Sequence, residues 1–299
     1  MKHFPKLLIV MVLLVSCQQT EKQQTTAPVP YLYWESNSVF CNGIRMHYWR
    51  TNTSGKPVMV LAHGITDFGL NWAPLAGRLE KDYDIIMYDA RGHGFSAKPE
   101  GPYDLETHVQ DLVAFLGVLA IEKPILIGHS MGGSVVALAA ATYPDLPAAV
   151  IMEDPPMDEA LEYLTPEIIP DWKAWVTEHT TMPKTQLIEN ARTTYHPGWS
   201  DFDYDLWAES KRLVIPNVID IVEGAGFGNP PETFPRISAP TLILKADAEE
   251  EFRKRHLATA ALLPNGRLIH IAGANHVIRN DKPDVVEQAI RDFLKGDSR

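Results

Sequence analysis

The stretch that decides the fold is ILIGHSMGGS, residues 125–134. An apolar run ends at Gly128, a serine follows at position 130, and Gly132 begins a helical pattern. This order predicts a strand, a sharp turn and a helix, with Ser130 at the apex of the turn. The two glycines keep side chains out of the close approach between strand and helix, so the Ser130 hydroxyl is pushed into the open. Because a serine hydroxyl is a poor nucleophile unless a base takes its proton, a histidine is needed from elsewhere in the chain.

Short apolar runs and helical patterns alternate on both sides of this turn. The apolar runs, which are typical of buried parallel strands, lie at 58–62, 85–88, 125–127, 149–152, 242–244 and 268–271. The helical patterns lie at 73–81, 105–120, 132–142, 251–263 and 283–294. An antiparallel hairpin, with Asn42 and Gly43 at its turn, precedes them. The alternation predicts an α/β fold with a mostly parallel, doubly wound sheet in one catalytic domain, residues 31–299.

One gap in the alternation, from residue 157 to residue 236, is too long for a loop. It contains four of the seven tryptophans of the chain, Trp172, Trp175, Trp199 and Trp207. We therefore expect a helical lid inserted after the strand at 149–152, rather than a second domain. Most of these aromatic side chains are expected to pack the lid against the main domain, and some to face a pocket.

The start of the chain has the pattern of a processing signal. Residues 1–6 are basic, residues 7–15 are apolar, and Leu14-Val15-Ser16-Cys17 resembles a bacterial lipobox, in which Cys17 carries a lipid. The alternative is a plain secretory signal with an incidental cysteine. Residues 18–30 are rich in Gln and Thr and have the composition of a flexible tether. We expect a lipid-anchored protein of the bacterial cell envelope, on the periplasmic face of the outer membrane because Gln18 follows the cysteine.

The acidic net charge restricts the classes of binding partner, and the small number of cysteines restricts the kinds of site that the chain can form. A net charge of −11 argues against nucleic acid or an anionic lipid surface, since both repel an acidic protein. Cys41 is the only cysteine of the mature domain, so an internal disulfide and a C-x-x-C site are excluded. The sequence also lacks an H-E-x-x-H motif. We expect a small-molecule substrate, no metal and no cofactor, with the lipid anchor as the only membrane contact; the oligomeric state stays open.

Together these motifs resemble the α/β-hydrolase superfamily over residues 31–296. Beside the G-x-S-x-G turn, the chain carries a His-Gly-Ile step at 63–65 and a D-x-R-G-x-G-x-S stretch at 89–96, which we interpret as a scaffold loop. The resemblance implies an α/β-hydrolase fold with Ser130 as the nucleophile. It also implies that the backbone N–H groups of Ile65 and Met131 form the oxyanion hole.

The same resemblance points to the base and leaves the acid open. His276 directly follows the last strand, where the family carries its triad histidine. The segment that should hold the acid departs from the usual pattern, and Asp247, near the end of its strand, is favoured. Glu249, at the usual offset, and Glu153, after the strand at 149–152, are the alternatives.

These residues predict a serine esterase that cleaves a carboxylic ester or lactone through an acyl-enzyme. The aromatic-rich lid favours a bulky substrate, and the pattern is loosely similar to bacterial macrolide esterases, which would imply antibiotic resistance. Haloalkane dehalogenases and epoxide hydrolases of this fold need an aspartate at the position of Ser130 and are disfavoured. The alternatives are a carbon–carbon bond hydrolase, an amidase or a cofactor-free peroxidase of the same fold, or a non-catalytic ligand-binding protein.

Overall fold

The computed structural model describes residues 33–157, 162–223 and 226–296. The expected signal peptide, the lipid-bearing Cys17 and the tether at 18–30 lie outside the described residues. In the part of the chain that is described, no helix has both the length and the apolar character needed to cross a membrane.

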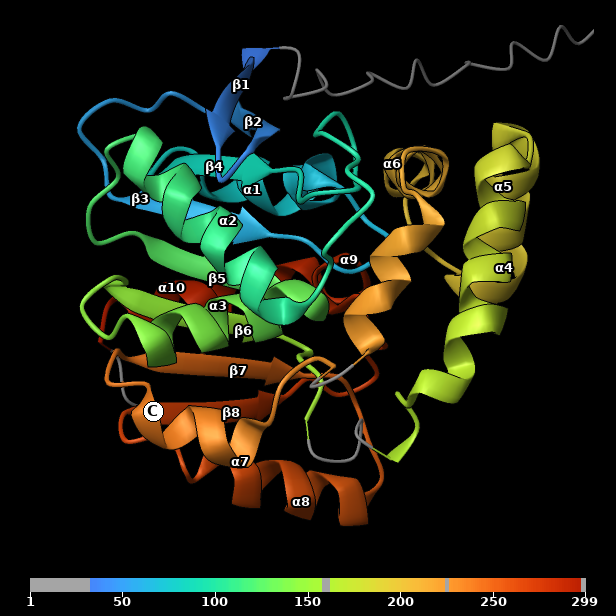
Figure 1. Cartoon of the computed structure of the whole chain (residues 1–299). Helices are drawn as coiled ribbons and strands as arrows, with labels where there is room; N and C mark the ends of the chain where they lie inside the picture. Colours follow the sequence, from blue (N-terminus) through green and yellow to red (C-terminus); the bar gives the residue numbers. More distant parts are fainter. Residues whose placement is uncertain (1–32, 158–161, 224–225, 297–299) are drawn as a thin grey trace, which may run out of the picture.

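One eight-stranded sheet forms the centre of the molecule, in the order β1-β2-β4-β3-β5-β6-β7-β8 (Figure 1). The hairpin strands β1 and β2 are antiparallel, β2 pairs antiparallel with β4, and every pair from β4 to β8 is parallel. The strands are β1 (Glu35–Cys41), β2 (Ile44–Arg50), β3 (Val58–Ala62), β4 (Asp84–Tyr88), β5 (Ile125–His129), β6 (Ala149–Glu153), β7 (Thr241–Lys245) and β8 (Gly266–His270). The predicted mostly parallel, doubly wound α/β sheet is confirmed.

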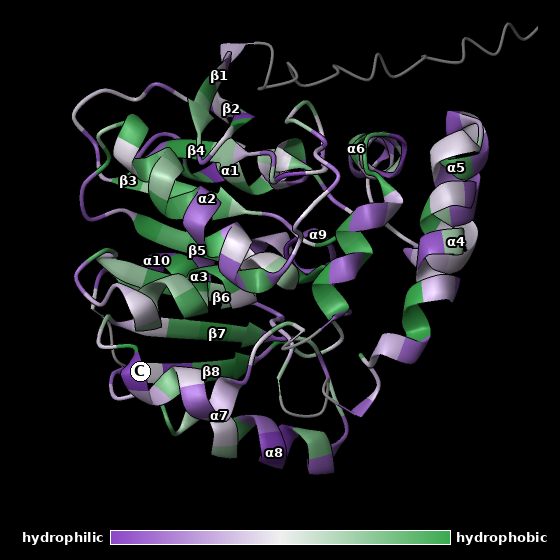
Figure 2. Ribbon diagram, viewed as in Figure 1, coloured by the Kyte–Doolittle hydropathy of each residue, from purple (hydrophilic) through white to green (hydrophobic). Residues whose placement is uncertain are grey.

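Helices cover both faces of the sheet because its central strands are apolar on both sides (Figure 2). Along β3, Val60 and Ala62 belong to one core cluster, whereas Met59 and Leu61 belong to the other. The first cluster lies under α2 (Leu105–Val118), α3 (Met131–Thr142) and α8 (Glu250–Ala260). The second lies under η2 (Gly69–Trp72), α1 (Ala73–Leu79), α9 (Ile278–Asp281) and α10 (Pro283–Leu294).

Most of the long segment between β6 and β7 is helical and stands at the carboxyl ends of the strands, whereas its last two short helices pack against α3 (Figure 1). Its elements are η4 (Pro166–Ile168), α4 (Ile169–Thr181), α5 (Lys184–Asn190), the π-helical turn η5 (Ala191–Tyr195), α6 (Asp201–Arg212), η6 (Pro216–Val222), α7 (Pro230–Thr233) and η7 (Phe234–Arg236). Trp199 anchors this insert, because its indole N–H donates to the Asp281 carboxylate of α9 at 2.7 Å. We call this segment the lid.

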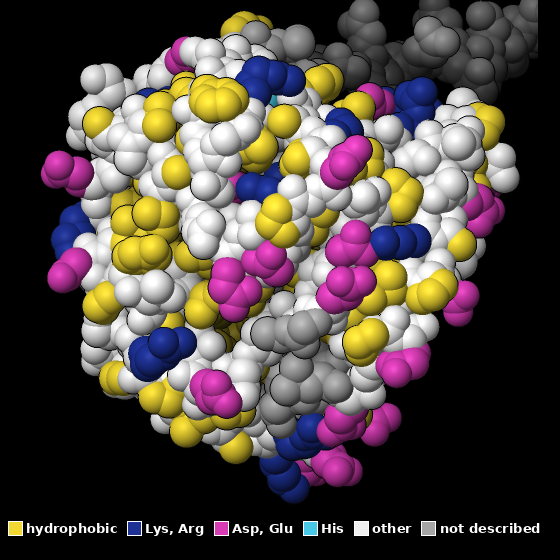
Figure 3. Space-filling model, viewed as in Figure 1, with side chains coloured by type: hydrophobic (Ala, Val, Ile, Leu, Met, Phe, Trp, Pro, Cys, Tyr) yellow, Lys and Arg dark blue, Asp and Glu magenta, His cyan; other side chains and the backbone are white. Residues whose placement is uncertain are grey.

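The face of the molecule shown in Figure 3 carries its acidic side chains without gathering them into one patch. On the face shown in Figure 3, acidic side chains are scattered and lysines and arginines lie between them. With a net charge of −11, this distribution gives a polyanion no attractive surface on this face.

Candidate active site

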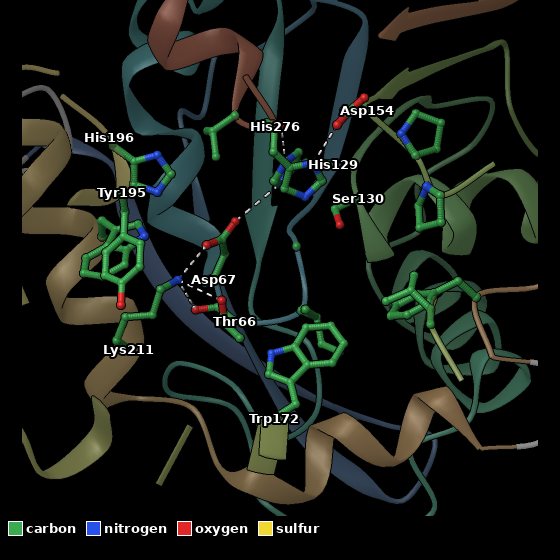
Figure 4. Close-up of a pocket in the computed structure, with 18 of the residues that line it drawn as sticks. Thr66, Asp67, His129, Ser130, Asp154, Trp172, Tyr195, His196, Lys211 and His276 are labelled. Atoms are coloured by element: carbon green, nitrogen blue, oxygen red, sulfur yellow. Dashed lines mark hydrogen bonds and ion pairs between the residues drawn. The ribbon is translucent and has the colours of Figure 1, made fainter. Parts of the chain in front are cut away.

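A pocket of about 590 Å³ lies between the strand ends and the lid (Figure 4). The predicted Ser130 and His276 both line it. The lid contributes aromatic side chains, namely Tyr163, Trp172, Trp175, Tyr195, Trp207 and Phe227. Three of the four lid tryptophans therefore line the pocket, so the expectation that most of them only pack the lid is wrong. Over the described ranges, no group of three or more His, Cys, Asp or Glu side chains could hold a metal ion.

Ser130 occupies a strained turn between β5 and α3, as the sequence predicts. Its backbone has φ 50° and ψ −118°, in the left-handed region that favours glycine. A Cβ on Gly128 would lie 2.1 Å from the Gly132 carbonyl oxygen, and a Cβ on Gly132 would lie 2.2 Å from that of Ala62. Only glycine fits at either position, and the close packing holds the serine at the pocket wall.

His276 is paired with a carboxylate that the sequence analysis did not weigh. Its Nδ1 lies 2.6 Å from Oδ2 of Asp154. The other oxygen of Asp154 lies 2.9 Å from Lys245 Nζ and accepts from the Ala246 N–H at 3.1 Å. Burial opposes ionisation of Asp154, but the hydrogen bond to His276 and the charge of Lys245 outweigh it and hold its pKa below the ordinary value. A carboxylate at Nδ1 selects the tautomer with the proton there, which leaves Nε2 able to accept one.

The hydroxyl of Ser130 and the ring of His276 share the pocket without a direct hydrogen bond among those formed by the described residues. The His276 side chain is 54% exposed, so its ring borders open space. In sites without a bound substrate, hydrogen bonds of this kind are often long and tighten when substrate enters.

The expectation that Asp247 orients His276 is wrong. Oδ2 of Asp247 accepts from the Gly273 N–H at 2.7 Å, and Oδ1 pairs with Arg253. Asp247 is exposed, and it braces the loop before His276 rather than contacting the ring. Glu249, the second candidate, is the exposed N-cap residue of α8 and has no contact with His276 either. The first turn of a helix is a favourable place for acidic side chains, which explains this one.

The third candidate, Glu153, precedes the correct position by one residue. It is buried, and its carboxylate lies 2.7 Å from the Arg279 guanidinium. The register pairs His129 with Glu153, so Asp154 is level with Ser130 at the strand ends. Glu153 is the last residue of β6 and faces Arg279, whereas Asp154 lies just past the strand with φ 42° and turns its side chain toward the pocket. The sequence held this signal as an aspartate one residue past a strand, followed by two prolines.

The two backbone groups expected to form the oxyanion hole are free to donate. Met131 is the first residue of α3, so its N–H has no acceptor within the helix. Ile65 follows β3 in a turn that the Asp67 N–H closes onto the Gly64 carbonyl at 3.0 Å. Within the described residues, neither the Ile65 nor the Met131 N–H has an acceptor. Free donors at a pocket edge suit a developing oxyanion.

Comparison with known proteins agrees with this geometry. The model of the alpha/beta hydrolase family matches residues 59–289. The 2-(acetamidomethylene)succinate hydrolase of Mesorhizobium japonicum is 28% identical over 252 residues, which cover 80% of this chain and 88% of the relative. Human epoxide hydrolase 4 is 24% identical over 86% of this chain and 78% of its own length.

Solved structures show the same architecture. The crystal structure of E-2-(acetamidomethylene)succinate hydrolase superposes with a TM-score of 0.74 at 24% identity, covering 88% of this chain and 99% of the other. At that identity the superposition shows the fold alone. The family model spans the sheet, the turn at Ser130 and the loop of His276. The chain therefore belongs to the alpha/beta hydrolase family and is a hydrolase.

Proposed function

We propose that this hydrolase cleaves carboxylic esters or lactones by acyl transfer to Ser130. The observation that carries the proposal is the pairing of His276 Nδ1 with Asp154 at 2.6 Å on the wall that also presents the Ser130 hydroxyl. This arrangement has the parts that serine acyl transfer requires, which are a nucleophile, a base and a carboxylate that orients the base.

The reaction proceeds in two balanced halves. Ser130 Oγ attacks the substrate carbonyl carbon while His276 Nε2 takes its proton, and the oxyanion accepts from the Ile65 and Met131 N–H groups. His276 then gives the proton to the leaving alkoxide, which leaves an acyl ester on Ser130. Water loses a proton to His276, attacks this ester, and releases the acid as the proton returns to Ser130.

The residue at position 130 favours this chemistry over epoxide opening, although the human relative named epoxide hydrolase 4 is 24% identical to the chain. A carboxylate that opens an epoxide forms an ester, which water can then cleave at its carbonyl. Serine attack on the same ring would form an ether, which has no carbonyl for water to attack. Ser130 therefore supports a carbonyl substrate.

The pocket wall favours a bulky, neutral substrate. Its two lysines are both paired with carboxylates, since Lys211 Nζ lies 3.2 Å from Asp67 and Lys245 Nζ lies 2.9 Å from Asp154. A substrate carboxylate would therefore be buried without a free cation from the described lining, at a considerable desolvation cost. The aromatic lid side chains offer flat apolar surface for a large ring such as a macrolide lactone.

Two esters of equal chain length test the preference for neutral substrates. We expect kcat/KM for p-nitrophenyl butyrate to exceed that for the mono-p-nitrophenyl ester of succinate by at least about tenfold, because only the succinate carries a charge into the pocket. Alkaline hydrolysis of both esters corrects for their intrinsic reactivity. A 16-membered lactone should gain the mass of one water. Faster turnover of the succinate ester would argue against a neutral substrate, and no turnover of any ester or lactone would overturn the esterase proposal.

We further propose that the protein is lipid-anchored in the cell envelope through Cys17. We expect Cys17→Ala to move the protein from the membrane fraction to the soluble fraction with esterase activity unchanged, because the substitution removes only the acceptor of the lipid. Cell fractionation and immunoblotting measure this, with Cys41→Ala as the matched control that stays with the membranes. Continued sedimentation of Cys17→Ala with membranes would contradict the anchor.

A further inference from the structure

The turn at residues 64–67 carries the Ile65 N–H, and side chains from other elements bind its carbonyl groups. Nε2 of His93 lies 2.6 Å from the Ile65 carbonyl oxygen, and the Asp67 N–H closes the turn. The next carbonyl, that of Thr66, is held by Lys211 Nζ at 2.8 Å. His93 belongs to the scaffold loop after β4, whereas Lys211 lies on the lid helix α6. One support of this turn therefore comes from the lid.

The ammonium group of Lys211 is fully engaged by the turn (Figure 4). It donates to the Thr66 carbonyl at 2.8 Å, to the Thr66 hydroxyl at 2.8 Å and to the Asp67 carboxylate at 3.2 Å. An ammonium has three N–H donors, which these three acceptors match, and the Ser210 hydroxyl lies further away at 3.4 Å. Lys211 is 2% exposed, and its Nζ lies 4.9 Å from the centre of the Trp207 ring. The charge thus acts on the turn and is not offered to a substrate.

Burial makes this contact sensitive to the loss of either partner. Burial lowers the pKa of Lys211, and the charge of Asp67 opposes that shift. Burial raises the pKa of Asp67, but the charge of Lys211 and then the contact with His129 outweigh this effect. The pKa of Asp67 is therefore well below its ordinary value. Without Lys211, the nearest other cation to Asp67 is Arg279 at 3.9 Å. A buried carboxylate that loses its partner tends to move toward water and would take the turn with it.

The same carboxylate also connects the turn to the rest of the site. Its Oδ2 lies 3.3 Å from Nδ1 of His129, which precedes Ser130. Nε2 of His129 lies 3.0 Å from the His276 carbonyl oxygen. The turn itself packs on this ring, since a Cβ on Gly64 would lie 2.8 Å from His129 Nδ1. A continuous chain of contacts therefore runs from the lid through Asp67 and His129 to the backbone of His276.

We propose that Lys211 is a positioning residue by which lid helix α6 holds the 64–67 turn, and with it the Ile65 N–H, in place for the oxyanion. The proposal rests on the acyl-transfer function proposed above. It makes the lid part of the catalytic geometry as well as a wall for the substrate. A shift of the turn by about 1 Å is enough to lower a rate by about 100-fold.

The test compares Lys211→Met with Lys184→Met on p-nitrophenyl acetate. Methionine keeps the stem of Lys211 and removes its charge. Lys184 is a matched control, since it forms the lid ion pairs to Asp205 at 2.9 Å and Glu209 at 3.2 Å and does not line the pocket. We expect Lys211→Met to lower kcat by about 10- to 100-fold with KM within about threefold of the wild type. Lys184→Met should match the wild type in both constants.

A second readout isolates the oxyanion. A trifluoromethyl ketone forms a tetrahedral adduct with the serine, so its inhibition constant should rise by the same factor as kcat/KM falls. Lys211→Arg, which keeps a donating cation, should recover part of kcat. If Lys211→Met is unfolded by circular dichroism, Thr66→Val carries the test, since it removes one acceptor of the ammonium. That variant should lower kcat by about three- to tenfold at unchanged KM.

Two results would overturn the positioning role. One is an unchanged kcat with a raised KM in Lys211→Met, which would make Lys211 only a part of the pocket wall. The other is an unchanged ketone inhibition constant beside a lowered kcat. Failure of the proposed function is a separate result, because the wild-type protein would then neither hydrolyse the acetate nor form the ketone adduct.

Discussion

Ser130→Ala will lower kcat for p-nitrophenyl butyrate by at least about 10⁴-fold, because alanine leaves no hydroxyl to form the acyl-enzyme. The fold should survive, since the Ser130 side chain borders the pocket and the substitution removes one atom. Steady-state kinetics on the purified variant measure the loss, and a fluorophosphonate probe should label the wild type and fail to label Ser130→Ala.

Ser134→Ala is the matched control for this loss. Ser134 lies one helical turn further along α3, is equally buried, and does not line the pocket. Labelling and turnover should therefore match the wild type. Labelling that persists in Ser130→Ala would assign the nucleophile to another residue. A wild-type protein that is never labelled would favour a ligand-binding protein over an enzyme.

Asp154→Asn will lower kcat by about 10³- to 10⁴-fold, and Asp247→Asn will leave it within about threefold of the wild type. An asparagine amide beside Nδ1 of His276 can favour the wrong tautomer and cannot balance the imidazolium charge. Asp247 touches the Gly273 N–H and Arg253 but not the His276 ring. Kinetics of both variants on one neutral ester measure the difference.

Thermal denaturation of the same variants separates catalysis from folding. Asp154 also accepts from Lys245, so Asp154→Asn leaves a buried ammonium with fewer partners and should lower Tm. The kinetic loss must be measured below that Tm. A large loss in Asp247→Asn with normal activity in Asp154→Asn would reverse the assignment of the acid.

The sequence was sufficient to predict those parts of the fold that depend on residues close together in the chain. Strand, turn and helix around Ser130 follow from neighbouring residues, because crowding at Gly128 and Gly132 involves atoms close along the chain or on the adjoining strand. The strand predicted at 125–127 extends to His129, a difference at its boundary only. Alternating apolar runs and helical patterns likewise reflect burial on both faces of a parallel sheet.

The carboxylate that pairs with His276 could not be predicted from neighbouring residues, because its position depends on the register between strands that are far apart in sequence. A shift of one residue exchanges Glu153, which faces Arg279, for Asp154, which faces His276. Both are acidic, so composition does not separate them. Asp247 was favoured because it lies near the end of its strand, but its loop turns the carboxylate to the Gly273 N–H.

The role of Lys211 was also beyond the sequence. A Lys-Arg pair at the end of a helix is typical of a solvated terminus, where cations are favourable. Arg212 fits that description with a half-exposed side chain, whereas Lys211 is buried against Thr66 and Asp67. Only the packing of α6 over the 64–67 turn distinguishes the two neighbours.

The unusual backbone at the ends of β5 and β6 has a consequence for engineering. Ser130 and Asp154 both have positive φ, at 50° and 42°, where glycine would be relaxed and any other residue costs about 1–3 kcal/mol. A screen that rewards heat resistance alone would thus accept glycine at position 130 and remove the nucleophile, whereas glycine at position 154 would also take a carboxylate partner from the buried Lys245. Thermal stability and turnover are opposed at the nucleophile, so stabilising substitutions should spare both strand ends and be placed on the outer helices.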